Sequence, residues 1–155
     1  MPAHTRDDLH RLRLIQVQSW QDIGKHLRRI VFHSPELADY PFRCNGAPFK
    51  LLLPREGQRA PVLPDCFENG RPRWANPADK PYSRTYTVRA YDAAACTFTV
   101  DFVLHGDNGP ASAFADQVQI GQTVAINAPR NTKDPMLVPA AEYLLIGYLT
   151  SVPSI

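Results

Sequence analysis

Residues 83–89 read Ser-Arg-Thr-Tyr-Thr-Val-Arg, and the rest of the chain is organised around this stretch. Thr, Tyr and Val favour extended backbone, and no Gly or Pro interrupts them, so the stretch predicts a β-strand. Side chains alternate across a strand, which places Arg84 and Tyr86 on one face. Thr87 and Arg89 are expected on the other face.

This arrangement suits a flavin dinucleotide. The guanidinium of Arg84 can grip a diphosphate, and the ring of Tyr86 can lie against a flat heterocycle. Thr87 offers a hydroxyl and a backbone N–H at the edge of that ring. The same residues on an isolated strand would also make an ordinary polar surface. The neighbouring sequence is therefore needed to decide between a flavin site and such a surface. Arg89, on the opposite face, is expected at most to form a salt bridge on the surface.

A second motif, His-Gly-Asp-Asn-Gly-Pro-Ala-Ser at residues 105–112, follows a strand-like run and opens a predicted helix. Together the two motifs resemble the siderophore-interacting protein family, the FAD-dependent ferric-siderophore reductases. The matching patterns are Arg-x-Tyr-Thr-x-Arg and His-Gly-x-x-Gly-Pro-Ala-Ser. With Gly-Ala-Pro-Phe-Lys at residues 46–50, the likeness spans about residues 12–155. The resemblance implies FAD as the cofactor.

The start of the predicted helix is suited to an anion, because its first N–H groups lack partners within the helix. Pro110 suits the first helical position, Ala111 would let a pyrophosphate approach closely, and Ser112 adds a hydroxyl. The resemblance places His105 against the FAD, near its adenosine or diphosphate, and has Val103 contribute backbone. The predicted cofactor-binding residues are therefore Arg84, Tyr86, Thr87, Val103, His105, Pro110, Ala111 and Ser112.

The resemblance also implies an oxidoreductase. NADH or NADPH would reduce the flavin, which would pass single electrons to a ferric siderophore. Fe(II) is held far less well by a hard-oxygen chelate, so reduction would release the iron. No side chain need act as an acid or a base, and no catalytic residue is predicted. Cationic groups such as Arg84 would stabilise the reduced anionic flavin and attract anionic chelates.

Composition narrows the classes of ligand and the cellular location that the chain can have. The chain has 155 residues and a formal net charge of +2, which gives no electrostatic case for binding nucleic acid or a membrane. No apolar run approaches the roughly 20 residues that span a bilayer, and residues 1–14 lack the apolar core of a signal peptide. A cytoplasmic protein is expected. The three cysteines and five histidines show no metal-site spacing, so no metal site is predicted.

The pattern of polar and apolar residues predicts an all-β domain over residues 10–130. Six short antiparallel strands, with one short helix between the last two, indicate a Greek-key barrel. The resemblance implies the ferredoxin-reductase-like FAD-binding fold. The long Pro-rich connection 55–82 is expected to be functional or disordered, with Trp74 pinning it to the barrel or covering the flavin. The strands are expected at residues 11–18, 26–34, 48–54, 83–89, 97–104 and 123–128, and the helix at residues 109–118.

Residues 131–155 are expected to be a linker and the remnant of an NAD(P)-binding domain. Tyr-Leu-Leu-Ile-Gly at residues 143–147 is typical of a buried parallel strand, the first of a truncated α/β domain. The family commonly continues Gly-Asp-Glu-Thr-Ala-Leu-Pro-Ala-Ile, whereas residues 147–155 read Gly-Tyr-Leu-Thr-Ser-Val-Pro-Ser-Ile. We expect the chain to bind FAD without oxidising NADPH at an appreciable rate. We also expect the apolar tail to support a homodimer.

Three interpretations stay open at this point. The chain is a ferric-siderophore reductase, a flavin-binding module that needs a partner reductase chain, or a cofactor-free β-barrel used for binding. A flavin spectrum of the purified chain would exclude the third interpretation. The first two interpretations differ in turnover, because only the first predicts that the chain reduces a ferric siderophore without a partner chain.

Overall fold

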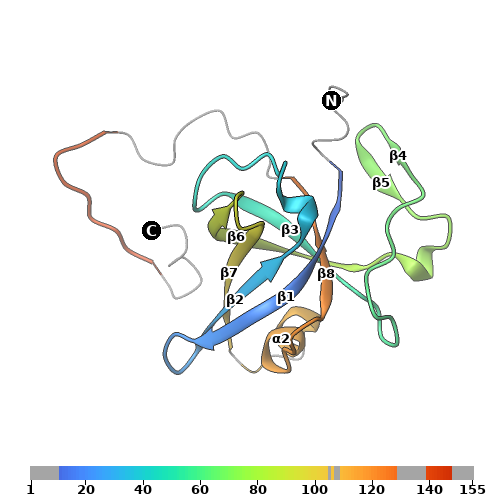
Figure 1. The fold of residues 1–155 in the computed structure, drawn as a ribbon, viewed down its shortest axis with the longest axis horizontal. Coiled ribbons are helices and arrows are strands. Elements are labelled where there is room, and N and C mark those ends of the chain that lie inside the picture. Colours follow the sequence, from blue (N-terminus) through green and yellow to red (C-terminus); the bar gives the residue numbers. More distant parts are fainter. Residues whose placement is uncertain (1–10, 105, 107–108, 129–138, 148–155) are drawn as a thin grey trace.

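A computed structural model describes residues 11–104, 106, 109–128 and 139–147. Six antiparallel strands form a closed barrel in the order β1-β2-β7-β6-β3-β8, which confirms the predicted barrel (Figure 1). Neighbours that are not consecutive in the chain, such as β2 beside β7, are expected for a Greek-key connection. The barrel strands are Arg13–Asp22 (β1), Leu27–His33 (β2), Pro48–Leu53 (β3), Tyr82–Asp92 (β6), Thr97–Val103 (β7) and Thr123–Ile126 (β8).

Alternate residues of the strands point inward and meet in one core that is rich in aromatic rings. In β7 these residues are Phe98, Val100 and Phe102, and all three are fully buried. Phe49 of β3 meets Phe98 edge to face, with ring centroids 4.9 Å apart, and Tyr40 packs on Phe98 at 5.3 Å. The apolar face that the alternation predicted is therefore the inner face of the barrel.

Helix α2, Pro110–Asp116, closes one end of the barrel (Figure 1). It begins close to the predicted position and ends earlier than expected. The ring of Phe114 packs at 6.0 Å from that of Phe102, which fixes the helix over the core. Arg28 of β2 donates from Nη1 to the carbonyl oxygens of the last two helical residues, at 2.9 and 3.0 Å. A cation there offsets the negative end of the helix dipole.

A buried charged cluster fastens β1 to the turn that follows β2. The fully buried side chain of Arg13 donates to the carbonyl oxygens of Glu36 at 3.0 Å and Asp39 at 3.3 Å. It also pairs with the Asp39 carboxylate at 3.3 Å, and its guanidinium carbon lies 5.4 Å from the centroid of the Tyr40 ring. Burial alone would raise the pKa of Asp39, but Arg11 and Arg13 together outweigh burial and lower it.

Two short 3-10 helices stabilise connections outside the barrel. They are η1, Pro35–Leu37, and η2, Pro77–Asp79. Ser34 caps η1, because its hydroxyl accepts a hydrogen bond of 3.2 Å from the backbone N–H of Glu36, and Pro35 occupies the first position of this helix.

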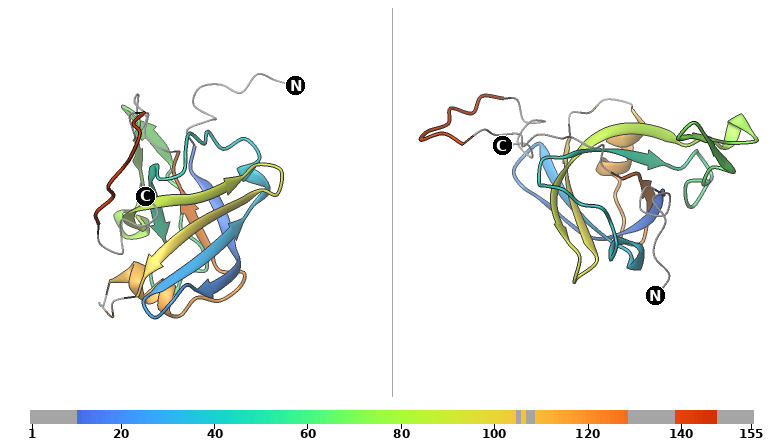
Figure 2. Two further views of the ribbon diagram at one scale, coloured as in Figure 1. Left: turned by 90° about the vertical axis from the view of Figure 1, so that its left-hand side faces the viewer. Right: turned by 90° about the horizontal axis from the view of Figure 1, so that it is seen from above.

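The connection 55–82 contains a hairpin that the sequence analysis missed. Strands β4, Cys66–Glu68, and β5, Arg71–Arg73, pair with each other and stand away from the barrel (Figures 1 and 2). Asn69 and Gly70 join them at φ values of 51° and 73°. A type I′ turn requires this left-handed pair, and Asn-Gly is its commonest sequence. The high proline content of the connection obscured that signal.

Trp74 lies at the base of the hairpin. Its Nε1 donates to the carbonyl of Val62 at 2.7 Å, so this contact joins two parts of the same connection. The expected roles, pinning the connection to the barrel or covering a flavin, stay predictions.

Residues 143–147 do not form the expected parallel strand. Residues 139–147 contain neither helix nor strand, and the side chains of Leu144 and Ile146 are each 85% exposed. A strand needs a neighbour for its N–H and C=O groups. No strand of the described part of the chain pairs with this segment. A first α/β strand is therefore absent from the described fold, and the domain boundary near residue 130 stays a prediction.

Candidate functional site

The pairing between β6 and β7 covers only half of β6. Residues 88–92 of β6 pair with residues 97–100 of β7, whereas residues 82–87 pair with β3. Residues 101–103 of β7 pair with β2. We call the place where residues 82–87 and 101–103 separate the β6–β7 seam. Residues 83–87 of the Ser-Arg-Thr-Tyr-Thr-Val-Arg stretch lie along this seam.

The backbone of β6 turns donors toward this seam. Val88 donates its N–H to the carbonyl of Ala47 at 2.9 Å and accepts from Gly46 at 2.7 Å, so its polar groups point to the β3 side. Successive residues of a strand turn these groups to opposite sides. Those of Thr85 and Thr87 therefore point to the seam. The predicted role for the N–H of Thr87 requires this orientation.

Arg84 and Tyr86 share one face of β6 but have different surroundings. Tyr86 is half-buried, with its ring centroid 4.6 Å from that of Phe102. Phe102 in turn contacts Phe114 of α2, so a row of rings joins β6 to the helix. Arg84 is exposed, and its Nη1 donates to the carbonyl of Ser83 at 2.9 Å. Among the described residues its guanidinium forms no ion pair, which makes it accessible to an external anion.

The second motif lies at the end of β7 and the start of α2. Pro110 occupies the first position of this seven-residue helix, as predicted, and Ser112 and Val103 are half-buried. Ala111 is only 6% exposed and belongs to the core, so it can offer a ligand little more than its backbone N–H. His105 lies outside the described residues.

Arg89 lies where the β6–β7 register shifts, on the face opposite Arg84. Its Nε is 3.9 Å from the carboxylate of Asp101, which is fully buried. Arg29 binds the same carboxylate through hydrogen bonds of 2.8 and 3.0 Å, and these raise the pKa of Arg29. The salt bridge expected of Arg89 is present, and it joins the two strands where the seam opens.

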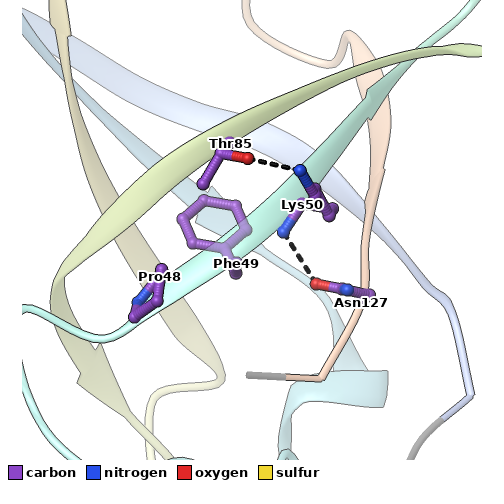
Figure 3. A pocket seen from close by; sticks show the side chains of 5 residues that line it. All are labelled: Pro48, Phe49, Lys50, Thr85 and Asn127. Carbon is purple, nitrogen blue, oxygen red and sulfur yellow. Dashed lines mark hydrogen bonds between the residues drawn. The ribbon is translucent and has the colours of Figure 1, made fainter. Parts of the chain in front are cut away.

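A small pocket on the outer face of β3 contains a cation that the sequence analysis did not select (Figure 3). Its volume is about 160 Å³, and Pro48, Lys50, Thr85 and Asn127 contribute to its lining. Lys50 donates from Nζ to the hydroxyl of Thr85 at 2.5 Å, and its backbone N–H donates to Oδ1 of Asn127 at 2.7 Å. The signal in the sequence was a single Lys within the apolar strand that begins at Pro48.

The structure also bears on metal and membrane binding. Across the described ranges, no group of three or more His, Cys, Asp or Glu side chains is placed to hold a metal ion. None of the helices in these ranges is long and apolar enough to cross a membrane.

The sequence matches one protein family over most of its length. Residues 16–133 match the siderophore-interacting FAD-binding domain. Ferric vibriobactin reductase ViuB of Vibrio cholerae is 31% identical over 143 residues, which cover 92% of this chain and 51% of ViuB. Ferric acinetobactin reductase of Acinetobacter baumannii is 29% identical over 79 residues, covering 51% of this chain and 28% of that protein.

Solved structures show the same fold. The siderophore-interacting protein SipS from Aeromonas hydrophila superimposes with a TM-score of 0.77 at 45% identity, covering 94% of this chain and 52% of SipS. A siderophore utilization protein from T. fusca superimposes with a TM-score of 0.64 at 31% identity, covering 79% of this chain and 46% of that protein. The chain thus spans about half the length of ViuB and SipS.

Proposed function

Because this chain belongs to the siderophore-interacting FAD-binding domain family, we propose that it binds one FAD at the β6–β7 seam and serves ferric-siderophore reduction in the cytoplasm. The observation that carries the proposal is the seam itself. Three features meet there. Thr87 lies on the edge of β6 that does not pair with β7, Arg84 has an exposed guanidinium, and Tyr86 has an aromatic ring that packs on Phe102.

The chemistry of the donors fits this cofactor. A diphosphate needs cations and N–H groups, which Arg84 and the first turn of α2, with Ala111 and Ser112, can supply. The isoalloxazine ring is flat and has acceptors along its edge. Tyr86 offers it an aromatic wall, and Thr87 offers it a hydroxyl and an N–H. We include Val103, His105 and Pro110 on the strength of the family resemblance.

Bound FAD would supply the electron chemistry by giving single electrons to Fe(III), while hydride transfer from NADH or NADPH to the FAD of this chain is expected to be negligible. The residues of this chain orient the ring and place positive charge beside it. Arg84 stabilises negative charge, and the row of rings from Tyr86 to Phe114 keeps water from one side of the site. Under this proposal no side chain transfers a proton.

We assign Lys50 to the approach of the ferric chelate. Its ammonium lies beside Thr85, whose strand forms one side of the seam. Many ferric siderophores are anionic chelates, and a cation near the flavin raises their local concentration. Lys50 lies on the face of the sheet opposite Arg84, so the two cations can serve different ligands.

We expect the FAD-loaded chain, reduced with dithionite and mixed anaerobically with an anionic ferric siderophore, to release ferrous iron. A chelator specific for Fe(II) measures the rate. Lys50→Ala should slow this step several-fold at low ionic strength, and the difference should fade above about 0.5 M salt because screening shortens the reach of the charge.

A neutral ferric chelate is the control, and its reduction should be insensitive to Lys50→Ala. An equal loss with the neutral chelate would overturn the role of Lys50. Absence of ferrous iron with the unaltered, FAD-loaded chain would overturn the proposed function.

A second candidate is a flavin-binding module that receives electrons from a partner chain. The exposed side chains of Leu144 and Ile146 favour it, because such apolar groups are usually covered by another surface. Separately from a partner reductase chain, we propose that two copies of this chain form a homodimer through residues 143–147. Sedimentation velocity tests this homodimer. If the chain stayed monomeric at every concentration up to about 100 μM, the Kd of the dimer would lie above that value and the proposal would be contradicted.

A further inference from the structure

A cavity of about 480 Å³ lies between helix α2 and the turn that follows β3. Arg55 and Gln58 line it from the turn, and Pro110 and Phe114 line it from the helix. Its size falls within the range of about 300–1,000 Å³ that is typical of small-molecule sites. Because Pro110 also begins the helix beside the β6–β7 seam, the cavity adjoins the proposed flavin site.

Arg55 is held in one orientation in this wall. Its guanidinium carbon lies 4.0 Å from the centroid of the Tyr82 ring, and its Nε donates to the carbonyl of Lys80 at 2.7 Å. Its backbone N–H donates to Oε1 of Gln58 at 3.0 Å, and the N–H of Gln58 donates back to the Arg55 carbonyl at 3.0 Å. These contacts occupy Nε and one face of the guanidinium of Arg55. The terminal Nη1 and Nη2 groups are the donors that an anion would meet.

The position of Arg55 relative to β6 links the cavity to the seam. Tyr82, Arg84 and Tyr86 occupy alternate positions of β6, so they share one face. Because Arg55 stacks on Tyr82, two guanidinium groups follow each other along this face before the Tyr86 ring. Side chains two residues apart on a strand are about 6.8 Å apart. A diphosphate can therefore meet both cations while a flavin lies at Tyr86.

We infer that this cavity takes the adenosine diphosphate half of FAD, with Arg55 as a further cofactor-binding residue. This inference rests on the proposed function. The fork of Arg55 matches phosphate oxygens, and Phe114 and Pro110 give an apolar wall for the adenine. The amide of Gln117 can donate and accept at the edge of the base. Glu56 is exposed at the rim, where its carboxylate suits ribose hydroxyls.

The test compares ligands that share the flavin and differ in the other half. FAD and riboflavin are titrated, by calorimetry and by flavin fluorescence, into the unaltered chain, Arg55→Ala and Arg71→Ala. Arg71 is an exposed arginine on β5 of the same connection and does not line the cavity. We expect Arg55→Ala to lower the affinity for FAD about tenfold and to leave that for riboflavin unchanged. Arg71→Ala should change neither, and ADP should compete with FAD less well in Arg55→Ala.

The outcomes separate the inference from the proposed function. An unchanged FAD affinity in Arg55→Ala would overturn the inference, as would an equal loss for FAD and riboflavin, which would mean that Arg55 acts through the fold. If the unaltered chain bound neither ligand, the proposed function would fail and the inference with it. Should Arg55→Ala fail to fold, Arg55→Lys keeps the charge but not the fork, and the same contrast between the two ligands applies.

Discussion

Arg84→Ala is expected to lower the affinity of the chain for FAD about ten- to a hundredfold. The guanidinium is exposed and forms no ion pair within the described structure, so its charge is available to the diphosphate. Charge-assisted hydrogen bonds contribute about 1.5–3 kcal/mol, which corresponds to that loss. Calorimetric titration of FAD into the two proteins measures the difference.

Two further variants sharpen this prediction. Arg84→Lys keeps the charge but loses the paired donors, so its FAD affinity should fall between those of the unaltered chain and Arg84→Ala. Arg71→Ala, which removes an exposed arginine from the hairpin, should bind FAD like the unaltered chain. If Arg84→Ala bound FAD with undiminished affinity, the assignment of Arg84 to the diphosphate would be wrong.

Arg13→Ala is expected to lower the free energy of unfolding by about 3–5 kcal/mol, as is usual when one partner of a buried ion pair is removed. The change takes away the donors on which the carbonyl groups of Glu36 and Asp39 depend. Arg11→Ala is the matched control, because Arg11 pairs with the same carboxylate from a side chain that is 36% exposed. It should cost at most about 1 kcal/mol. Urea unfolding measures both, and equal losses would contradict the account of the buried cluster.

The pH dependence of this cluster follows from Asp39. Its pKa is lowered from the ordinary value of 3.8, since the pull of Arg11 and Arg13 exceeds the effect of burial. A carboxyl with a lowered folded-state pKa contributes stability that is present above the unfolded pKa and is lost as the pH falls through the folded pKa. The difference in unfolding free energy between the unaltered chain and Arg13→Ala should therefore shrink below about pH 4. A difference that stayed constant down to pH 2 would rule out this contribution.

The barrel was predictable because the burial pattern of each strand can be read from consecutive residues of the sequence. Alternation along residues 11–18 and 97–104 reports which face of each strand is buried, and the structure has strands there. The strand expected at residues 143–147 failed for the opposite reason. Its apolar side chains predict burial, but a parallel strand forms only beside a neighbour, and the described residues provide none. An apolar composition therefore does not by itself predict whether a neighbouring strand is present.

The candidate site was predictable in part. Arg84 and Tyr86 were selected because they lie in one short motif, and alternation alone gives their common face. Lys50 and Arg55 were missed because their relation to that motif is not local. Lys50 reaches Thr85 through β3–β6 pairing, and Arg55 reaches Tyr82 through a turn that folds back on the sheet. No spacing in the sequence reports these contacts.

The central claim is that FAD binds along the unpaired edge of β6, and residue-level amide hydrogen exchange with and without FAD tests it most directly. We expect FAD to slow exchange of the amides of Thr85 and Thr87, which point to the seam, and of those in the first turn of α2. The amides of the hairpin at residues 66–73 should exchange at the same rate in both samples. If FAD bound tightly and left the exchange of Thr85 and Thr87 unchanged, the cofactor would lie elsewhere and the account would be wrong.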